Sequence, residues 1–216
     1  MSGNNSSRIS VVGLTGGIAS GKNFVAEIFS KNGAAIFDAD KEVHLLLESN
    51  QDVIAQIKKN FPQSLVNHKI DRKILGKIVF DKKSAQKLKI LEEILHPKVR
   101  SKYQDFLSDA KKSNKKIVVL NIPLLHETKA YESDYVVAVI ASPSVRKKRF
   151  LVRERLKDKE GFAKRKSDLE KKFDQIQKNQ LSNRQQIQNA DFVINTNSSK
   201  AKTVEDVKLL IRQLLC

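Results

Sequence analysis

The chain has 216 residues, of which 40% are hydrophobic and 30% are charged, and its formal net charge at pH 7 is +17. This apolar content is enough to fold about one domain around a core, which argues against a disordered chain. The longest uncharged apolar runs, 117–120 and 136–141, are far shorter than the roughly 20 residues of a membrane-spanning helix. We therefore expect no membrane partner.

The residues that usually build disulfides and zinc sites are scarce. The single cysteine, Cys216, cannot form a disulfide within the chain, and the four histidines are not spaced like metal ligands. The first eight residues are mostly polar and lack the apolar segment of an export signal. These features predict a cytoplasmic protein.

The first elements predicted along the chain form a βαβ unit. Residues 9–14 are a short apolar run that indicates a buried strand, and a loop with two adjacent glycines follows. Apolar residues at helical spacing predict a helix from Lys22 to the Asn32-Gly33 pair, where a left-handed residue ends it. Residues 34–37 predict a second strand, parallel to the first by the right-handed crossover rule.

A long helical region interrupts the sheet. Apolar faces at helical spacing recur up to residue 116, and we interpret residues 47–116 as a helical insertion. Within it, Pro97 is expected to start a new helix, since proline is tolerated at the first helical position. Strands predicted over 117–122, 135–141 and 192–195 complete an α/β fold with a five-stranded parallel sheet and flanking helices. The predicted core consists of residues 8–46 and 117–216.

Residues 16–23 match the phosphate-loop pattern G-x-x-x-x-G-K. Glycines in such a loop let backbone N–H groups surround a phosphate, the lysine, here Lys22, reaches the β- and γ-phosphates, and the next helix directs its positive end at them. Asn23 stands where a Ser or Thr hydroxyl normally ligates Mg²⁺, so we predict a weaker metal requirement or a raised nucleotide KM. The alternative is a glycine-rich turn that only connects a strand to a helix.

Two carboxylates, Asp38 and Asp40, follow the second predicted strand. Alternation along the strand is expected to send both toward the ligand crevice at the carboxyl end of the sheet. One of them then accepts the proton of an attacking hydroxyl, while the other holds Mg²⁺ through water. We assign the metal to Asp38 together with Asn23. The alternative is a solvated strand end that caps the next helix.

Positive charge is concentrated between residues 146 and 172, which include thirteen basic and five acidic residues. Arg146, Arg149 and Arg153 share one helix face, so a basic lid over about 150–190 is expected to present guanidinium groups to a phosphate. One alternative is a solvated basic surface, and another is a protein that binds nucleic acid. With 6% aromatic residues there is little for stacking on single strands, so we expect no nucleic-acid partner.

In their order along the chain, these motifs resemble the dephospho-CoA kinase family. The matching segments, which span nearly the whole chain, are 14–22, 38–40, 71–72, 79–80, 95–97, 123–127 and 190–194. The resemblance implies a P-loop kinase fold with a substrate-binding insertion and a basic lid. It also implies that ATP, with Mg²⁺, phosphorylates the ribose 3′-hydroxyl of dephospho-CoA, the final step of coenzyme A biosynthesis.

The resemblance further implies individual roles. Asp40 matches the catalytic base, and Lys22 and Arg149 match groups that neutralise charge on the transferred phosphoryl group. The residues expected to bind ATP are Gly17, Ala19, Ser20, Gly21, Lys22, Asn23, Phe24, Arg149 and Arg153. Those expected to bind the acceptor are Thr15, Asp38, Asp40, Arg72, His96, Leu124, Leu125 and Glu127.

Several of these assignments leave alternatives open. His96 could instead be a structural hydrogen-bonding residue, and the two leucines could pack in the core. The loop 195–198 departs from the family pattern near the adenine, and Gln186 replaces a basic residue, with Gln180 and Arg184 nearby. A nucleoside or nucleotide kinase is the second interpretation, but it does not account for His96-Pro97 in a helical insertion. We expect a monomer or a weak homo-oligomer.

Overall fold

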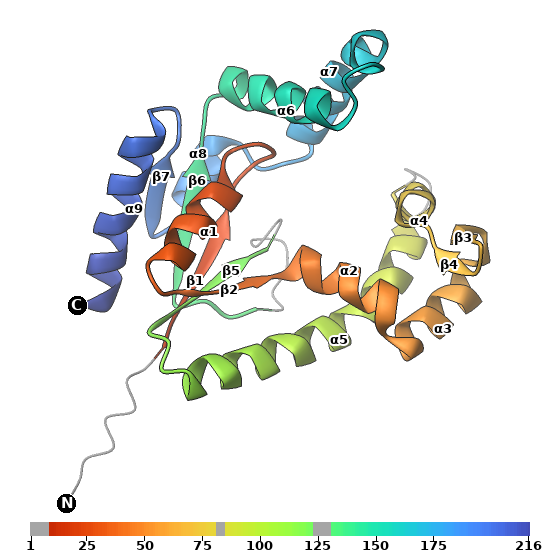
Figure 1. The fold of residues 1–216 in the computed structure, drawn as a ribbon, viewed down its shortest axis with the longest axis horizontal. Helices are drawn as coiled ribbons and strands as arrows, with labels where there is room; N and C mark the ends of the chain where they lie inside the picture. The colour runs from red at the N-terminus through yellow and green to blue at the C-terminus, as the bar shows by residue number, and fades with distance from the viewer. Residues whose placement is uncertain (1–8, 81–84, 123–130) are drawn as a thin grey trace, which may run out of the picture. The chain divides into compact units, whose positions relative to one another are not determined.

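The computed structural model describes residues 9–80, 85–122 and 131–216 (Figure 1). Contacts divide the chain into two compact units. Residues 1–37 and 110–216 form the first, which we call the sheet unit, and residues 38–109 form the second, which we call the helical unit.

A five-stranded sheet with strand order β2-β5-β1-β6-β7 organises the sheet unit. Its strands are β1 (Ser10–Thr15), β2 (Ala35–Asp38), β5 (Ile117–Asn121), β6 (Tyr135–Ile140) and β7 (Phe192–Asn195). The central strand β1 pairs in parallel with β5 and β6, and β6 pairs in parallel with β7. The predicted five-stranded parallel sheet is confirmed.

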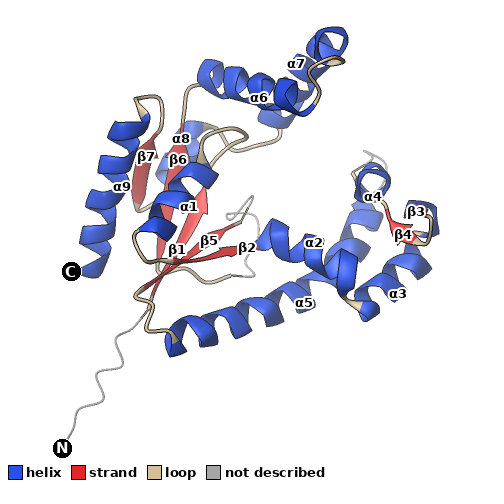
Figure 2. Ribbon diagram, viewed as in Figure 1, coloured by secondary structure: helices blue, strands red, loops and turns tan. Residues whose placement is uncertain are grey.

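Helices flank this sheet (Figure 2). Those next to the sheet are α1 (Lys22–Lys31), α8 (Asn183–Gln188) and α9 (Lys200–Leu215), whereas α6 (Pro143–Lys157) and α7 (Phe162–Lys178) pack on each other and extend away from it. Because successive strand residues point to opposite faces, Val12 and Leu14 of β1 lie on one face together. There they join Phe29 of α1 and Val207 of α9 in one buried cluster. The apolar faces of α1 and α9 thus cover one side of the sheet.

The helical unit is built mainly from four helices, of which the last runs on into the sheet unit. These are α2 (Ala39–Ser49), α3 (Gln51–Asn60), α4 (Arg72–Val79) and α5 (Ala85–Lys112), and a short 3₁₀ turn (Pro62–Ser64) follows α3. The unit overlaps most of the range 47–116 that the sequence analysis assigned to an insertion. A substrate-binding role for it stays a prediction.

A small hairpin in this unit departs from the mostly helical pattern expected of the region. Strands β3 (Leu65–Val66) and β4 (Lys69–Ile70) pair antiparallel. The two residues between them, Asn67 and His68, have φ values of 49° and 63°. Two consecutive left-handed residues form the turn that matches the twist of a tight hairpin, and asparagine tolerates that conformation well.

The expectation that Pro97 starts a new helix is wrong. Helix α5 runs through this residue from Ala85 to Lys112. Leu95, Val99 and Tyr103, each four residues apart, are all buried and form one stripe on both sides of the proline. Proline in a helix interior removes one backbone hydrogen bond and crowds the preceding turn. Packing of the continuous apolar stripe outweighs that cost.

Replacing Pro97 by alanine is therefore expected to stabilise the protein by about 1–2 kcal/mol. This is the roughly 3 kcal/mol penalty of an interior proline, reduced by the extra freedom that alanine gives the unfolded chain. Thermal unfolding would show a midpoint raised by several degrees, on the order of 2–4 °C for each kcal/mol. Lys102→Ala, an exposed change on the same helix, is the control and should have little effect. An unchanged or lowered midpoint for Pro97→Ala would show that the proline does not destabilise this helix.

Candidate functional site

The loop between β1 and α1 has the backbone of a phosphate-binding loop. Ala19 and Gly21 have positive φ values of 57° and 102°, and Gly21 is the residue that precedes α1. Helix α1 begins without a side-chain cap, and its first turn has no acidic residue. The partial positive charge of this helix end is therefore not neutralised by the helix itself, which favours an anion there.

Gly16, at the start of the loop, cannot carry a side chain. A Cβ atom placed on it would lie 2.5 Å from the Val139 carbonyl oxygen and 2.6 Å from the Ser20 Oγ. It would also lie 3.2 Å from Cγ of Lys22, so the stem of that lysine runs back over the start of the loop. The loop glycine and the lysine of the motif are thus packed together, as the phosphate-loop interpretation requires.

Arg149 of α6 and Thr196, the residue after β7, hold the loop from outside. The Thr196 hydroxyl donates a hydrogen bond to the Ser20 carbonyl oxygen at 2.6 Å. One Arg149 nitrogen donates to the Thr196 hydroxyl at 2.9 Å and to the Ser20 carbonyl at 3.3 Å, and the other donates to the Thr196 carbonyl at 2.6 Å. Arg149 therefore lies at the loop, whereas Thr196, which the sequence analysis did not single out, is its buried partner.

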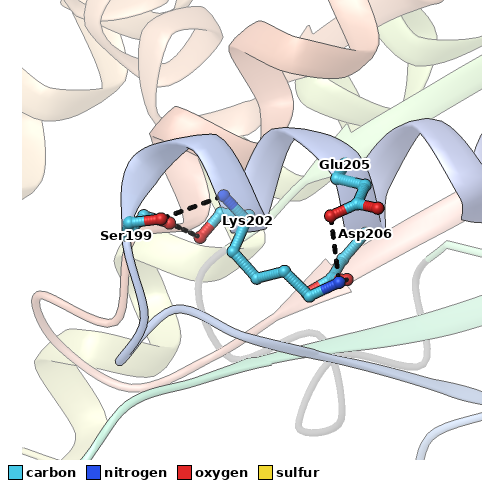
Figure 3. A network of polar contacts seen from close by, with 5 residues as sticks. Ser199, Lys202, Glu205 and Asp206 are labelled. Carbon is cyan, nitrogen blue, oxygen red and sulfur yellow. Dashed lines mark hydrogen bonds and ion pairs between the residues drawn. The ribbon is translucent and has the colours of Figure 1, made fainter.

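Three residues after Thr196, Ser199 caps the start of α9. The backbone N–H of Lys202 donates to the Ser199 Oγ at 3.2 Å at the start of α9. The Lys202 ammonium pairs with Glu205 at 3.0 Å and with Asp206 at 3.2 Å (Figure 3). The hydrogen bond to Glu205, followed by the one to Asp206, raises the pKa of Lys202. This cap fixes the helix end that follows the Thr196 loop.

The basic segment packs against the phosphate loop. Phe150 of α6 and Phe173 of α7 lie with their ring centroids 5.6 Å apart in a small apolar cluster. Ile18 and Ala19 of the loop pack on that cluster. Just beyond α7, Gln180 accepts a hydrogen bond from the backbone N–H of Ile18 at 2.8 Å. The segment proposed as a lid thus contacts the loop through both apolar packing and a polar contact.

The three arginines predicted to share one face of α6 differ in their surroundings. Besides Arg149 at the Ser20 carbonyl, Arg146 is buried, with 3% of its surface exposed. The guanidinium of Arg153 lies over the Phe150 ring at 5.6 Å and 3.7 Å from a Glu154 carboxylate oxygen, and its side chain is 54% exposed. A role for Arg153 in ATP binding stays a prediction. The sequence analysis placed Arg146 on the same helix face but did not include it among the residues expected to bind ATP.

Asn23, the departure from the usual phosphate loop, contacts the end of a neighbouring strand. Its Oδ1 accepts a hydrogen bond from the side-chain amide of Asn121 at 3.3 Å. Asn121 is the last residue of β5 and is buried, whereas Asn23 is exposed. The contact orients the amide of Asn23, and its single oxygen, the type of ligand that Mg²⁺ prefers, accepts this hydrogen bond and has one further lone pair.

Asp38 and Asp40 do not alternate along a strand, which corrects the expected geometry. Strand β2 ends at Asp38, whose carboxylate caps α2 by accepting the backbone N–H of Lys41 at 3.1 Å. Asp40 is exposed in the first turn of that helix. The alternative that this strand end caps a helix is therefore confirmed for Asp38. The roles of both carboxylates in the chemistry stay predictions.

The remaining predicted residues are distributed over both units. Thr15 is buried at the end of β1, and Phe24 of α1 packs on the sheet core with the Lys200 ammonium 5.9 Å from its ring centroid. Arg72 is exposed at the start of α4, and His96 is exposed on α5. Leu124, Leu125 and Glu127 lie outside the described residues.

In residues 9–80, 85–122 and 131–216, no three acidic, histidine or cysteine side chains gather as a metal-binding group. No helix in the same residues has the length and apolar content to span a membrane.

Comparison with known proteins gives one consistent result. Residues 10–202 match the dephospho-CoA kinase family. A curated dephospho-CoA kinase of Bartonella quintana is 36% identical over 206 residues, which cover 95% of this chain and 98% of that protein. The corresponding protein of Wolbachia pipientis wMel is 36% identical over 207 residues, 94% of this chain and 97% of its own.

Solved structures agree with this result. A dephospho-CoA kinase structure from Campylobacter jejuni is 27% identical, with a TM-score of 0.60, and the match covers 94% of this chain and 96% of that one. A structure from Thermus thermophilus is 24% identical with a TM-score of 0.79 and covers 96% of this chain and 98% of that one. The latter likeness concerns the fold alone.

Proposed function

Because the chain belongs to the dephospho-CoA kinase family, we propose that it transfers the γ-phosphoryl group of ATP to the ribose 3′-hydroxyl of dephospho-CoA. The products are coenzyme A and ADP. The observation that carries this proposal is the phosphate loop, in which the packing of Gly16, the stem of Lys22 and the uncapped start of α1 form one anion-binding element.

The residues of the chain divide the reaction between them. The phosphate loop binds the phosphates of ATP, and Lys22 and Arg149 neutralise the negative charge that develops on the transferred group. The acceptor hydroxyl oxygen attacks the γ-phosphorus as its proton passes to the Asp40 carboxylate, and ADP leaves. Arg72 and His96, both exposed in the helical unit, are proposed to contact the acceptor.

The nucleotide is proposed to bring Mg²⁺. No dedicated cluster of metal ligands occurs in the described residues, so phosphate oxygens and water are expected to supply most ligands. Asn23 fits as a further ligand because it offers an amide oxygen at the loop, and Asp38 is proposed to act through water. When bound, the ion would neutralise charge on the phosphates.

Asn23→Ser is expected to restore a tighter metal requirement. The hydroxyl is the usual Mg²⁺ ligand at this position. The Mg²⁺ concentration for half-maximal rate, or the KM for ATP, should therefore fall by about 2- to 10-fold, which corresponds to the net contribution of one hydrogen bond. Steady-state rates over a Mg²⁺ series measure this. Asn60→Ser, on an exposed helix end, is the matched control. Unchanged Mg²⁺ and ATP dependence would show that Asn23 does not weaken metal binding.

The proposed activity is tested by ADP release from purified protein with Mg²⁺ and ATP. Dephospho-CoA, AMP, adenosine and no acceptor are compared, and mass spectrometry locates the added phosphate on the product. Turnover only with dephospho-CoA supports the proposal. Turnover with AMP or adenosine instead would indicate a nucleotide or nucleoside kinase. We further propose a cytoplasmic protein that is monomeric or weakly associated and acts without nucleic acid.

A further inference from the structure

Arg146 is a buried cation that lacks a counter-ion in the described protein. Only 3% of its surface is exposed, although it lies near the start of an otherwise highly basic helix. Its Nε is buried and makes no hydrogen bond within the described residues, and no ion pair joins its guanidinium to a described carboxylate. Burying a charge without a partner is unfavourable, because nothing replaces the hydration that the charge loses. Burial also lowers the pKa of this guanidinium.

The guanidinium lies directly against the phosphate loop. A Cβ atom placed on Gly17 would be 2.0 Å from one Arg146 terminal nitrogen and 3.0 Å from its Cζ. The same position is 3.2 Å from the Gln180 oxygen that accepts from the Ile18 N–H. Arg146 is thus in contact with the second residue of the loop, whereas Arg149 is bonded to Ser20 farther along it.

The other neighbour of Arg146 is aromatic. Its Cζ lies 5.9 Å from the centroid of the Phe173 ring. An aromatic face stabilises a cation only modestly and supplies no hydrogen-bond acceptor. The guanidinium of Arg146 is therefore packed against a ring that accepts none of its hydrogen bonds.

We propose that Arg146 is a further nucleotide-binding residue whose counter-ion is the phosphate chain held by the loop. The inference rests on the proposed function, because it takes the loop ligand to be a nucleotide. A guanidinium is suited to this task, since it is planar, remains charged when buried and forms paired hydrogen bonds with phosphate oxygens. The unpaired charge then lowers the stability of the ligand-free protein, and it raises the affinity for phosphate because the bound phosphate supplies the missing counter-ion.

Arg146→Met tests this account because it keeps an unbranched stem and removes the charge. The dissociation constant of the ATP analogue AMP-PNP with Mg²⁺, measured by calorimetry, should rise about 10- to 100-fold, as for loss of a hydrogen bond between charged groups. The melting temperature of the ligand-free protein should stay the same or rise, because an unpaired buried charge is gone. Arg155→Met, on an exposed position of the same helix, is the matched control and should change neither value.

A purely structural role for Arg146 predicts the opposite pair of results. The melting temperature would then fall and AMP-PNP would bind as before, which would overturn the inference. Should Arg146→Met fail to fold, Arg146→Lys decides, because a lysine keeps the charge but not the paired donors. It should weaken AMP-PNP binding about 3- to 10-fold, and an unchanged affinity would count against the proposal.

The wild-type protein separates this inference from the proposed function. If it binds AMP-PNP but does not phosphorylate dephospho-CoA, the proposed reaction is overturned while the affinities of the Arg146 variants still decide the inference. If the wild type does not bind AMP-PNP, both are overturned.

Discussion

Asp40→Asn is expected to lower kcat for dephospho-CoA phosphorylation by about 10²- to 10⁴-fold, the usual contribution of a general base. The substitution keeps the size of the side chain and its place in the first turn of α2 but removes the carboxylate that would accept the hydroxyl proton. The affinity for ATP should change little, because the proposed role concerns the acceptor. Single-turnover phosphoryl transfer with saturating Mg²⁺ and ATP measures the effect.

The control for Asp40→Asn is Glu42→Gln, which removes an acidic charge from the same first helical turn. It should leave kcat within about twofold, as is usual for a surface change of this kind. A decrease of less than threefold in Asp40→Asn would place the base elsewhere. Asp38→Asn would then be the next variant, and its stability should change little, because an asparagine oxygen can accept the same backbone N–H of Lys41 and keep the helix cap.

Gly16→Ala is expected to disrupt the phosphate loop. The added methyl group would lie 2.5 Å from the Val139 carbonyl oxygen, which belongs to the backbone of β6 and cannot turn away as a side chain would. Such overpacking typically costs about 1–3 kcal/mol of folding free energy. The loop must also shift, so AMP-PNP affinity should fall more than about 10-fold, as when fitted electrostatic donors are displaced. Denaturant unfolding and calorimetry measure the two effects.

Gly76→Ala provides a matched control for the glycine change. This glycine lies inside α4, and an added Cβ would meet only Phe80 at 3.9 Å, an ordinary contact. Because alanine is the better helix former, the control should gain about 0.5–1 kcal/mol of stability and keep AMP-PNP affinity. Equal AMP-PNP affinity in Gly16→Ala and the wild type would mean that the loop tolerates the shift.

The parts of the fold that could be predicted are those with strong local patterns. Buried strands such as 117–121 are almost continuously apolar, and a loop with fixed glycine and lysine spacing follows the first strand. These signals are local in the chain and were sufficient for the sheet and its phosphate loop. Strand ends came within one residue of the predicted ones, because polar residues or glycines mark them.

The parts of the fold that could not be predicted depend on packing that outweighs local residue preferences, or on contacts between residues far apart in the sequence. Packing along α5 outweighed the local preference of Pro97, and a two-residue turn at Asn67-His68 made a hairpin between two segments with a helical pattern. The helix starting at Ala39 broke the expected alternation of the two aspartates. The partnership of Thr196 with Ser20 involves residues 176 positions apart, and no local pattern indicates it.

These distant partnerships bear on how the protein is made. The loop from Gly16 to Gly21 is synthesised well before Gln180 and Thr196, which lie 162 and 176 residues downstream of their partners Ile18 and Ser20. Synthesis proceeds at roughly 5–20 residues per second, so about ten seconds or more pass between synthesis of the loop and synthesis of these two residues. A nascent chain is therefore expected to acquire an ordered phosphate loop only after both of these residues have been synthesised, and shortened products that end before residue 180 are expected to lack it.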